Sequence, residues 1–417
     1  MLFLSRIKTS RLALRVNTIW HLARRLAPSL AVFVCGAMSI YIADIVIRSL
    51  FEDHVVRDWA VLKSIVFTLS SFAAIGLDQA LIREPSKWNV LKYSIFSCVI
   101  VISVTSAAIV YITGIYERFA GLAAAIVLIS MGNVAFSLLR VNGAYGLAFI
   151  ARDGWKVLFL IGVVISYYYK FSYFEYVIIS CALFPAAASL YLFYKSSPRL
   201  VDDLFDDMNG FFSALKVGFP FAISSASLSI AIYSEIALLR ILGDGDIIAD
   251  YFVANICFVS SILMVNTFVA SVLVGYVRRD PARWVRFLKS GKIYFLVIFF
   301  VSPLLSYLSG YILNIVLFSD IQIPYIWAVF MSLTAGLRMI YTLISVTVGS
   351  LSDKLDVTKT SIYYLLSAVC FMALAILLNY HIEDAGAAMA IATAFHWLMR
   401  SLVGVGAVGR VMRRYSA

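Results

Sequence analysis

Residues 26–61, LAPSLAVFVCGAMSIYIADIVIRSLFEDHVVRDWAV, have a second copy at residues 218–253, GFPFAISSASLSIAIYSEIALLRILGDGDIIADYFV. A shift of 192 positions, with no gap, aligns Pro28 with Pro220, Tyr41 with Tyr233, Arg48 with Arg240, Asp58 with Asp250, Trp59 with Tyr251 and Val61 with Val253. Each copy has a proline early in an apolar helix, charged residues late in it, an acidic turn, and an aromatic residue opening the next helix. A repeat offset by almost half the chain length predicts a duplicated helical bundle.

The composition places that bundle in a membrane. Of the 417 residues, 62% are hydrophobic and 14% are charged, whereas soluble domains are about 45–50% apolar and about 25% charged. Apolar runs recur along the whole chain, and a run of about 20 residues crosses a bilayer as a helix. The net charge of +11 comes from basic residues at alternate helix ends, which indicates orientation rather than a nucleic-acid partner.

Twelve spans are expected, with approximate bounds 26–50, 59–82, 93–115, 121–142, 147–169, 173–194, 217–242, 251–277, 293–317, 325–349, 361–380 and 385–408. Connections after even-numbered spans are basic, and those after odd-numbered spans are mostly acidic. By the positive-inside rule, both termini are predicted to be cytoplasmic.

Six spans in each half give the two halves the same orientation, so we expect two pseudo-symmetric six-helix bundles related by an axis along the membrane normal. The predicted organisation is a basic cytoplasmic segment 1–25, bundles 26–194 and 217–408, an interfacial linker 195–216, and a basic tail 409–417.

Four short stretches carry a family pattern: AAIGLDQALIRE at 73–84, LKVGFP at 215–220, Ser234-Glu235 followed by Leu-Leu-Arg240, and GAAMA at 386–390. They resemble the corresponding places of the Wzx-type oligosaccharidyl-lipid flippases of Gram-negative bacteria. That family shares a superfamily with the MATE drug antiporters and the lipid II flippase. This chain departs from the family pattern in having Glu235 in place of Asp and a displaced Arg240.

The resemblance implies that the protein turns an undecaprenyl-pyrophosphate-linked oligosaccharide from the cytoplasmic to the outer leaflet of a bacterial inner membrane, for O-antigen or exopolysaccharide synthesis. It also implies partners in the polysaccharide polymerase and chain-length machinery. No cofactor is expected, and coupling to a proton or sodium gradient is left open.

Charged residues inside spans point to a site, because an ionisable group at mid-bilayer costs about 2.5–3.5 kcal/mol on insertion scales. Bases outnumber acids there, which favours an anionic cargo over a cationic drug. We therefore predict a cationic cavity along the substrate path, formed by Arg48, Lys63, Arg140, Arg152, Lys156, Arg240, Arg338 and Arg400. The ion-coupling candidates are Asp44, Glu235 and His396.

Structural interpretations stay open beside these functional ones. Arg338, at the middle of its span, is expected in a water-filled cavity, the alternative being backbone carbonyls in a helix interface. Asp44 and Glu235 can form structural ion pairs, and His396 can be a packing residue. The bases at 140, 152 and 156 fit either membrane anchoring or pyrophosphate docking.

Other functions explain the sequence less well. A MATE-like or other drug or metabolite antiporter is the main alternative. A membrane polymerase or glycosyltransferase would need a large outer loop, and the predicted outer loops are short. Gly404-Val-Gly-Ala-Val-Gly409 matches a dinucleotide fingerprint but closes a membrane helix, where small residues favour close helix packing.

Overall fold

The computed structural model describes residues 31–78, 88–141, 144–195, 204–242 and 245–415. Within these ranges every regular element is helical, which confirms the all-α prediction. The expected N-terminal segment 1–25 lies outside the described residues.

Each of the twelve expected spans corresponds to helix. The first helix is Ala31–Leu50. It is followed by α2 (Asp53–Ser70), α4 (Trp88–Ile112), α5 (Phe119–Val141), α6 (Tyr145–Tyr168), α7 (Phe174–Lys195), α8 (Leu204–Ile241), α9 (Ile248–Asn255), a π-helical turn (Ile256–Ser260), α10 (Ser261–Arg279), α11 (Pro281–Ser290), α12 (Lys292–Leu317), α13 (Tyr325–Leu351), α14 (Lys354–His381) and α15 (Ala385–Arg414).

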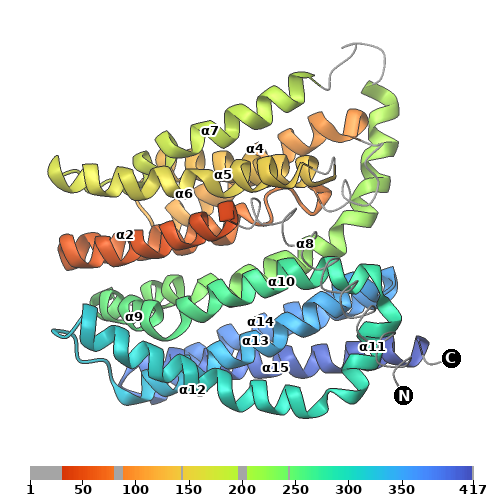
Figure 1. Ribbon diagram of the computed structural model, residues 1–417. Coiled ribbons are helices and arrows are strands. Elements are labelled where there is room, and N and C mark those ends of the chain that lie inside the picture. The colour runs from red at the N-terminus through yellow and green to blue at the C-terminus, as the bar shows by residue number, and fades with distance from the viewer. Residues whose placement is uncertain (1–30, 79–87, 142–143, 196–203, 243–244, 416–417) are drawn as a thin grey trace, which may run out of the picture.

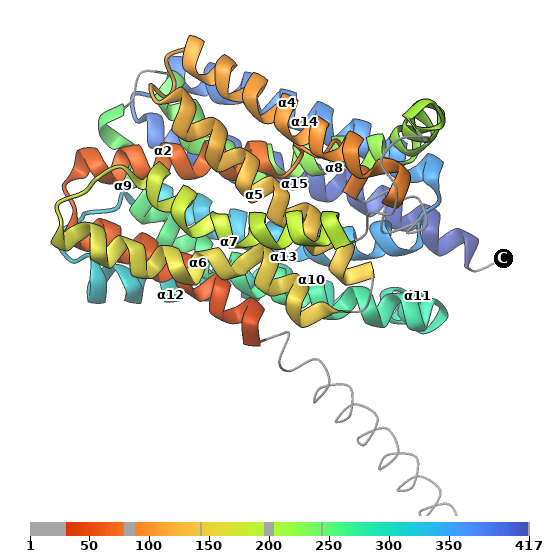
Figure 2. The ribbon, with the colours of Figure 1, turned by 90° about the horizontal axis from the view of Figure 1, so that it is seen from above.

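The helices form two layers that follow the two halves of the sequence (Figure 1). In the first half α5 packs against α2, α4, α6 and α7, and in the second half α13 packs against α10, α12 and α15. The halves meet chiefly where α2 lies along α8 and α9. Figure 2 shows the same helices from above, with α11 at the end where the chain's C-terminus lies. This is the expected arrangement of two bundles.

A glycine contact joins the two layers. The second span was expected to reach residue 82, but α2 ends at Ser70 and a turn follows, with Ile75 (φ 48°) and Gly76 (φ 69°) in left-handed conformation. A Cβ added at Gly76 would lie 2.1 Å from the carbonyl oxygen of Gly218 on α8. Only glycine at 76 allows this close approach of the two backbones.

The segment expected as a linker contributes to a longer helix. Residues 204–216 begin α8, which continues to Ile241, while 196–203 lie outside the described residues. Figure 1 shows the start of α8 running across the ends of the other helices before the chain turns in line with them. This course suits an interfacial position.

Eight of the described helices are long and apolar enough to cross a membrane. The helices α2 and α6 have the length but carry several charged residues, among them Lys63 on α2 and Arg152, Asp153 and Lys156 on α6. Charged residues in a spanning helix face a cavity or a partner rather than lipid. These two charged helices are therefore the first place to look for a site.

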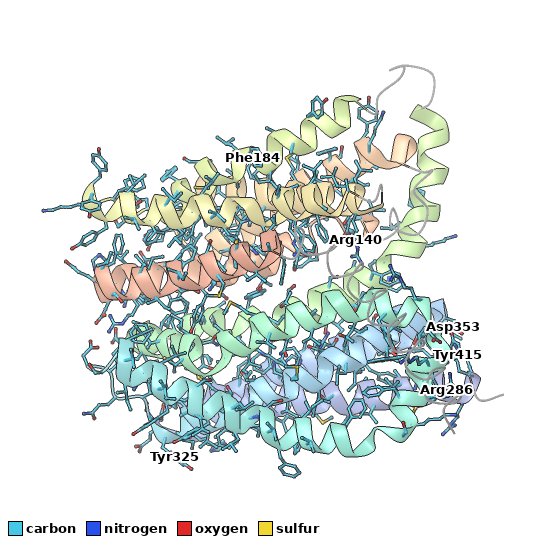
Figure 3. All side chains as sticks on the ribbon, viewed as in Figure 1. Arg140, Phe184, Arg286, Tyr325, Asp353 and Tyr415 are labelled. Atoms are coloured by element: carbon cyan, nitrogen blue, oxygen red, sulfur yellow. The ribbon has the colours of Figure 1, made fainter. Side chains whose placement is uncertain are left out.

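The outer surface is apolar, and the two ends of the molecule are more polar. Side chains such as Phe184 and Val316 are largely exposed on the outside of the bundles. Figure 3 places Arg286, Asp353 and Tyr415 at the end of the C-terminus and Tyr325 at the opposite end. The exposed apolar band between the ends is what lipid would cover.

Small residues bring helices of the second half close together. A Cβ added at Gly336 would lie 2.4 Å from Cγ of Pro303, and one at Gly404 would lie 2.3 Å from Cγ2 of Ile344. Gly404 therefore serves the close packing expected for the 404–409 motif, whereas Gly406 and Gly409 have no such neighbour.

Candidate functional site

A cavity of about 300 Å³ lies between the two halves. The first helix, α2, α5 and α6 form most of its wall, and Tyr233 of α8 with Leu263, Met264 and Thr267 of α10 closes the other side. Its charged lining residues are Asp44, Lys63, Arg152, Asp153 and Lys156. The cavity is therefore built from the charged faces of α2 and α6.

One charged group of the cavity is centred on Asp44, which is 1% exposed. The Lys63 ammonium donates to one oxygen of this carboxylate, and Trp59 donates to the other from Nε1 at 2.9 Å. The ammonium also lies 5.5 Å from the ring centroid of Phe252 in the second half. The pair thus belongs to the first half but faces the boundary between the halves.

The second charged group is centred on Asp153, also 1% exposed. Its Oδ2 accepts from Arg152 Nε and Nη2 at 2.9 and 2.7 Å, and its Oδ1 accepts from Lys156 Nζ at 2.5 Å. Arg152 also stacks on Phe136, 4.2 Å from the ring centroid. Gly36 lets the first helix approach, since a Cβ there would lie 2.7 Å from Asp153 Cβ.

Asp153 is not among the residues predicted from the sequence. Its signal was the spacing: it directly follows Arg152 and precedes Lys156 by three positions, so one turn of α6 holds an acid between two bases. With Asp153 included, the cavity has three bases against two acids. The positive charge of the cavity is thus smaller than we expected from counting the bases and acids of all the predicted spans.

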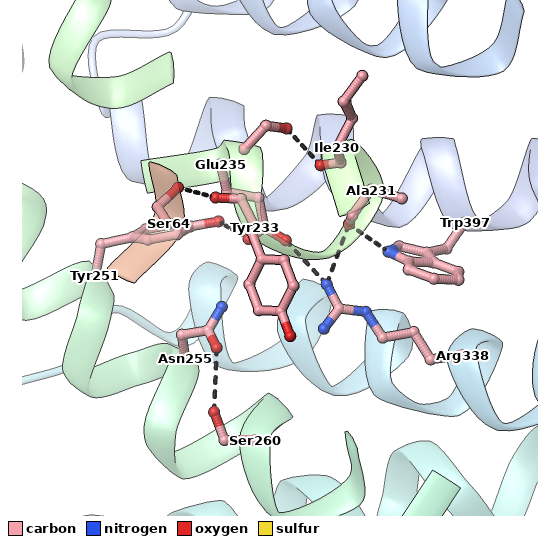
Figure 4. Close-up of polar contacts among 11 residues, drawn as sticks. Ser64, Ile230, Ala231, Tyr233, Glu235, Tyr251, Asn255, Ser260, Arg338 and Trp397 are labelled. Carbon is pink, nitrogen blue, oxygen red and sulfur yellow. Dashed lines mark hydrogen bonds and ion pairs between the residues drawn. The ribbon is translucent and has the colours of Figure 1, made fainter. Parts of the chain in front are cut away.

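Two other candidates form an ion pair inside the second half (Figure 4). Arg338 Nη2 lies 3.0 Å from Glu235 Oε1 and 3.4 Å from the carbonyl oxygen of Ala231. The other oxygen of Glu235 accepts from Tyr251 Oη at 2.9 Å. The side chains of Arg338 and Glu235 are only 3% and 4% exposed. The structure does not bring this pair to the cavity but places it in the interface between α8 and α13.

Arg400 and His396 also lie within the second half. Arg400 is fully buried and donates to Ser227 Oγ at 2.5 Å and Tyr341 Oη at 3.0 Å. The ring of His396 stacks on Phe371 at 5.0 Å between centroids, and neither ring nitrogen has a hydrogen-bond partner among the described residues. Neither side chain lines the cavity.

The remaining candidates lie near the helix ends. Arg48 forms an ion pair with Asp53 at 2.5 Å, and Arg140 lies 5.9 Å from the ring centroid of Phe136. Arg240 lines a second, smaller cavity. Of the eight predicted cations, Lys63, Arg152 and Lys156 come together in the main cavity, joined by one coupling candidate, Asp44.

Several solved structures have a fold similar to that of this chain. An inward-facing MATE multidrug resistance transporter of the MOP superfamily aligns over 91% of this chain and 96% of its own, with 15% identity and a TM-score of 0.57. The lipid II flippase MurJ, in an inward closed conformation, aligns over 91% and 88%, with 12% identity and a TM-score of 0.58. An outward-facing MATE structure gives 16% identity, 93% and 95% coverage, and a TM-score of 0.54. This chain has the MATE and MurJ fold.

The MATE and MurJ fold accommodates different cargoes, since the neighbours include drug transporters and a lipid flippase. No protein-family model and no curated protein matches the sequence. Identities this low establish the architecture alone and leave open what the cavity of this chain binds.

The cavity can hold an anionic head group beside polar groups. Arg152 and Lys156 supply charged donors, and Ser70, Ser71 and Asn133 add hydroxyl and amide groups to the lining. Among the described residues there is no group of His, Cys, Asp and Glu suited to a metal ion. A ligand in this cavity would meet both charged and neutral hydrogen-bond donors.

Proposed function

We propose that this protein is an alternating-access flippase that moves an undecaprenyl-pyrophosphate-linked oligosaccharide from the cytoplasmic to the outer leaflet of a bacterial inner membrane. The observation that carries the proposal is the cavity between two six-helix halves, with three bases against two acids in its lining. The MATE and MurJ fold supports the transport class, and the resemblance of the four sequence stretches supports the cargo.

Arg152 and Lys156 are the groups best suited to the pyrophosphate. Arg152 lies about two turns and Lys156 about three turns into α6, from the end that the charge pattern assigns to the cytoplasm. A guanidinium offers paired donors to phosphate oxygens and an ammonium offers a point charge. Both already bind Asp153, so an arriving pyrophosphate shares them with this carboxylate and their position is fixed in advance.

Single hydrogen bonds are among the contacts that join described residues of the two halves, and alternating access can exchange such bonds. Ser64 donates to the carbonyl oxygen of Tyr233, Ser71 bonds to Ser229, and Tyr41 donates to the carbonyl oxygen of Ile256 at 3.4 Å. Exchanging such single hydrogen bonds costs about 0.5–1.5 kcal/mol each. In this proposal the halves rock apart at one end while the polyprenyl chain stays in lipid.

Asp44 and Lys63 are the proposed coupling pair. A proton on Asp44 would weaken its attraction for the Lys63 ammonium, which would then be available to the anionic cargo. The polymerase and chain-length machinery remain proposed partners on the strength of the resemblance.

A MATE-like antiporter is the second candidate function. It is favoured by one observation, the two carboxylates of Asp44 and Asp153 in the cavity wall. Both are already bound by bases, which lowers their value for a cationic drug.

The deciding experiment compares ligands on purified, full-length protein in nanodiscs. Undecaprenyl pyrophosphate and a cationic dye are titrated against the wild type, Lys156→Gln and the matched control Lys359→Gln, which changes an exposed lysine of α14. We expect Lys156→Gln alone to weaken lipid binding about tenfold, the effect of one charge-assisted hydrogen bond. Tight dye binding with no binding of the pyrophosphate lipid would favour the antiporter instead.

A further inference from the structure

A second cavity, of about 190 Å³, lies at the end of the molecule opposite the C-terminus. Arg57 of α2 and Arg118, just before α5, come from the first half, and Arg240 at the end of α8 comes from the second. Asp58 and Glu117 also line it. Five charged side chains thus surround one small space, and three of them are guanidinium groups.

Two of these guanidinium groups point to a common place. A Cβ built on Gly245 would lie 3.2 Å from Arg240 Nη1 and 3.9 Å from Arg57 Nη1. Like charges come this close where an anion or solvent separates them, because their repulsion is otherwise unscreened. Glycine at 245 leaves this place free of a side chain.

The present partners of these groups leave N–H groups open to an anion. Arg57 lies 3.6 Å from Asp246, whose side chain is fully exposed, and the buried Nε of Arg57 has no hydrogen-bond partner. Arg240 is exposed, so its N–H groups are open to an arriving anion. Arg118 is held in place by Glu175 at 3.0 Å and by the ring of Tyr173, which leaves its remaining N–H groups available.

We propose that this cavity is an anion site for a phosphoryl group, formed where the two halves meet. Guanidinium groups bind phosphoryl oxygens through paired N–H donors. Since Arg57 and Arg118 belong to one half and Arg240 to the other, a bound phosphoryl group bridges the halves and stabilises their contact at this end. The net charge of the lining is one positive unit, so binding is salt-sensitive.

The natural occupant rests on the proposed function. If the main cavity admits a pyrophosphate-linked sugar, the second cavity is where its pyrophosphate is held at the outer end before release. The site itself does not depend on that cargo, because its chemistry suits any small phosphoryl group.

The test maps arginine reactivity on the purified full-length protein. Phenylglyoxal modifies accessible arginines, and mass spectrometry reports each one separately, with and without inorganic pyrophosphate. We expect pyrophosphate to slow modification of Arg57 and Arg240 about tenfold, while exposed Arg286 on α11 reacts unchanged. In Arg240→Gln the protection of Arg57 should fall; in the control Arg286→Gln it should persist.

The outcomes separate this inference from the proposed function. Protection of Arg152 without protection of Arg57 and Arg240 overturns the second site and leaves the main cavity as a pyrophosphate site. Protection of Arg57 and Arg240 without Arg152 keeps the second site and counts against the proposed cargo. Equal protection of Arg286 shows only a general ionic effect and also overturns the inference.

Discussion

The two halves of the chain contain the same acid–aromatic pair in different surroundings. Trp59 donates to Asp44 in the first half, and its repeat counterpart Tyr251 donates to Glu235 in the second, both at 2.9 Å. In the first half the base is Lys63, on the next helix, and the pair lines a cavity. In the second half Arg338 comes from α13, and the pair is sealed by packing.

The two copies of the repeated unit therefore differ in where the cation of the acid comes from. The repeat counterpart of Lys63 is Asn255, which accepts a hydrogen bond from Ser260 at 3.4 Å and carries no charge. The second half therefore takes its base from a distant helix and so joins α8 to α13. We infer that the sealed pair holds the second half together, whereas the accessible pair can exchange partners.

Breaking the sealed pair should have the largest effect. Arg338→Met leaves Glu235 buried without its cation, which costs about 3–5 kcal/mol of stability. The thermal unfolding midpoint in detergent measures this loss, with Arg286→Met as the exposed control. The double variant with Glu235→Gln should recover most of the loss. A double variant as unstable as the sum of both single changes would argue against the pair as a structural unit.

A smaller loss is expected when only the aromatic donor is removed. Tyr251→Phe leaves Glu235 Oε2 without its hydrogen bond in a buried place, at a cost of about 1–3 kcal/mol. Tyr380→Phe, on an 86% exposed side chain, is the control. Equal unfolding midpoints for the two variants would mean that water reaches Glu235, contrary to the sealed arrangement.

The accessible pair should matter more for function than for stability. In Lys63→Met the carboxylate of Asp44, itself 1% exposed, keeps its hydrogen bond from Trp59 and borders the main cavity, so we expect a smaller stability loss than in Arg338→Met. Export of the lipid-linked cargo, measured in proteoliposomes, should fall at least about tenfold if the pair couples transport. If Lys63→Met lost as much stability as Arg338→Met, the pair at the cavity and the pair inside the second half would not differ as we infer.

The smallest effect is expected at an acid outside the spans. The backbone N–H of Asp356, and then Arg414, lower the pKa of exposed Asp353 below its ordinary value of 3.8. The ionised Asp353 carboxylate contributes to folding stability above pH 3.8, and this contribution is lost as the pH falls below that value. The gap between the unfolding midpoints of wild type and Asp353→Asn should therefore be constant above pH 4 and close below. If the difference between the two midpoints grew as the pH fell, the pKa of Asp353 would not be lowered in the folded protein.

The fold could be predicted because hydropathy and the repeat are local signals. Apolar runs of bilayer length gave helices close to the expected places. The end of α2 could not be placed, because Gly76 turns the chain to meet Gly218, a contact between residues far apart in the sequence. Likewise, the continuation of α8 back to Leu204 does not follow from hydropathy, since that part is not apolar enough to be a span.

The site could be predicted in part. A charge within a span indicates a polar environment but does not say which helix faces it. Lys63 and Lys156 were expected at the cavity and line it, whereas Arg338 meets Glu235 from 103 positions away, inside one half. Only the packing of the helices decides whether a charged residue lines the cavity or is buried inside one half. Asp153 was not predicted, because its charge is offset by Arg152 and Lys156 on the same turn of α6.

In the proposed rocking motion, the contact of Gly76 with Gly218 is the pivot between the halves. Two bare backbones can change their angle at this point without side chains colliding, and nearly the full length of α2 separates it from Arg57. A small change of angle at the glycines would therefore displace α2 relative to α8 by an amount that grows with distance from the contact. The widest displacement falls at the far mouth, where Arg57 faces Arg240.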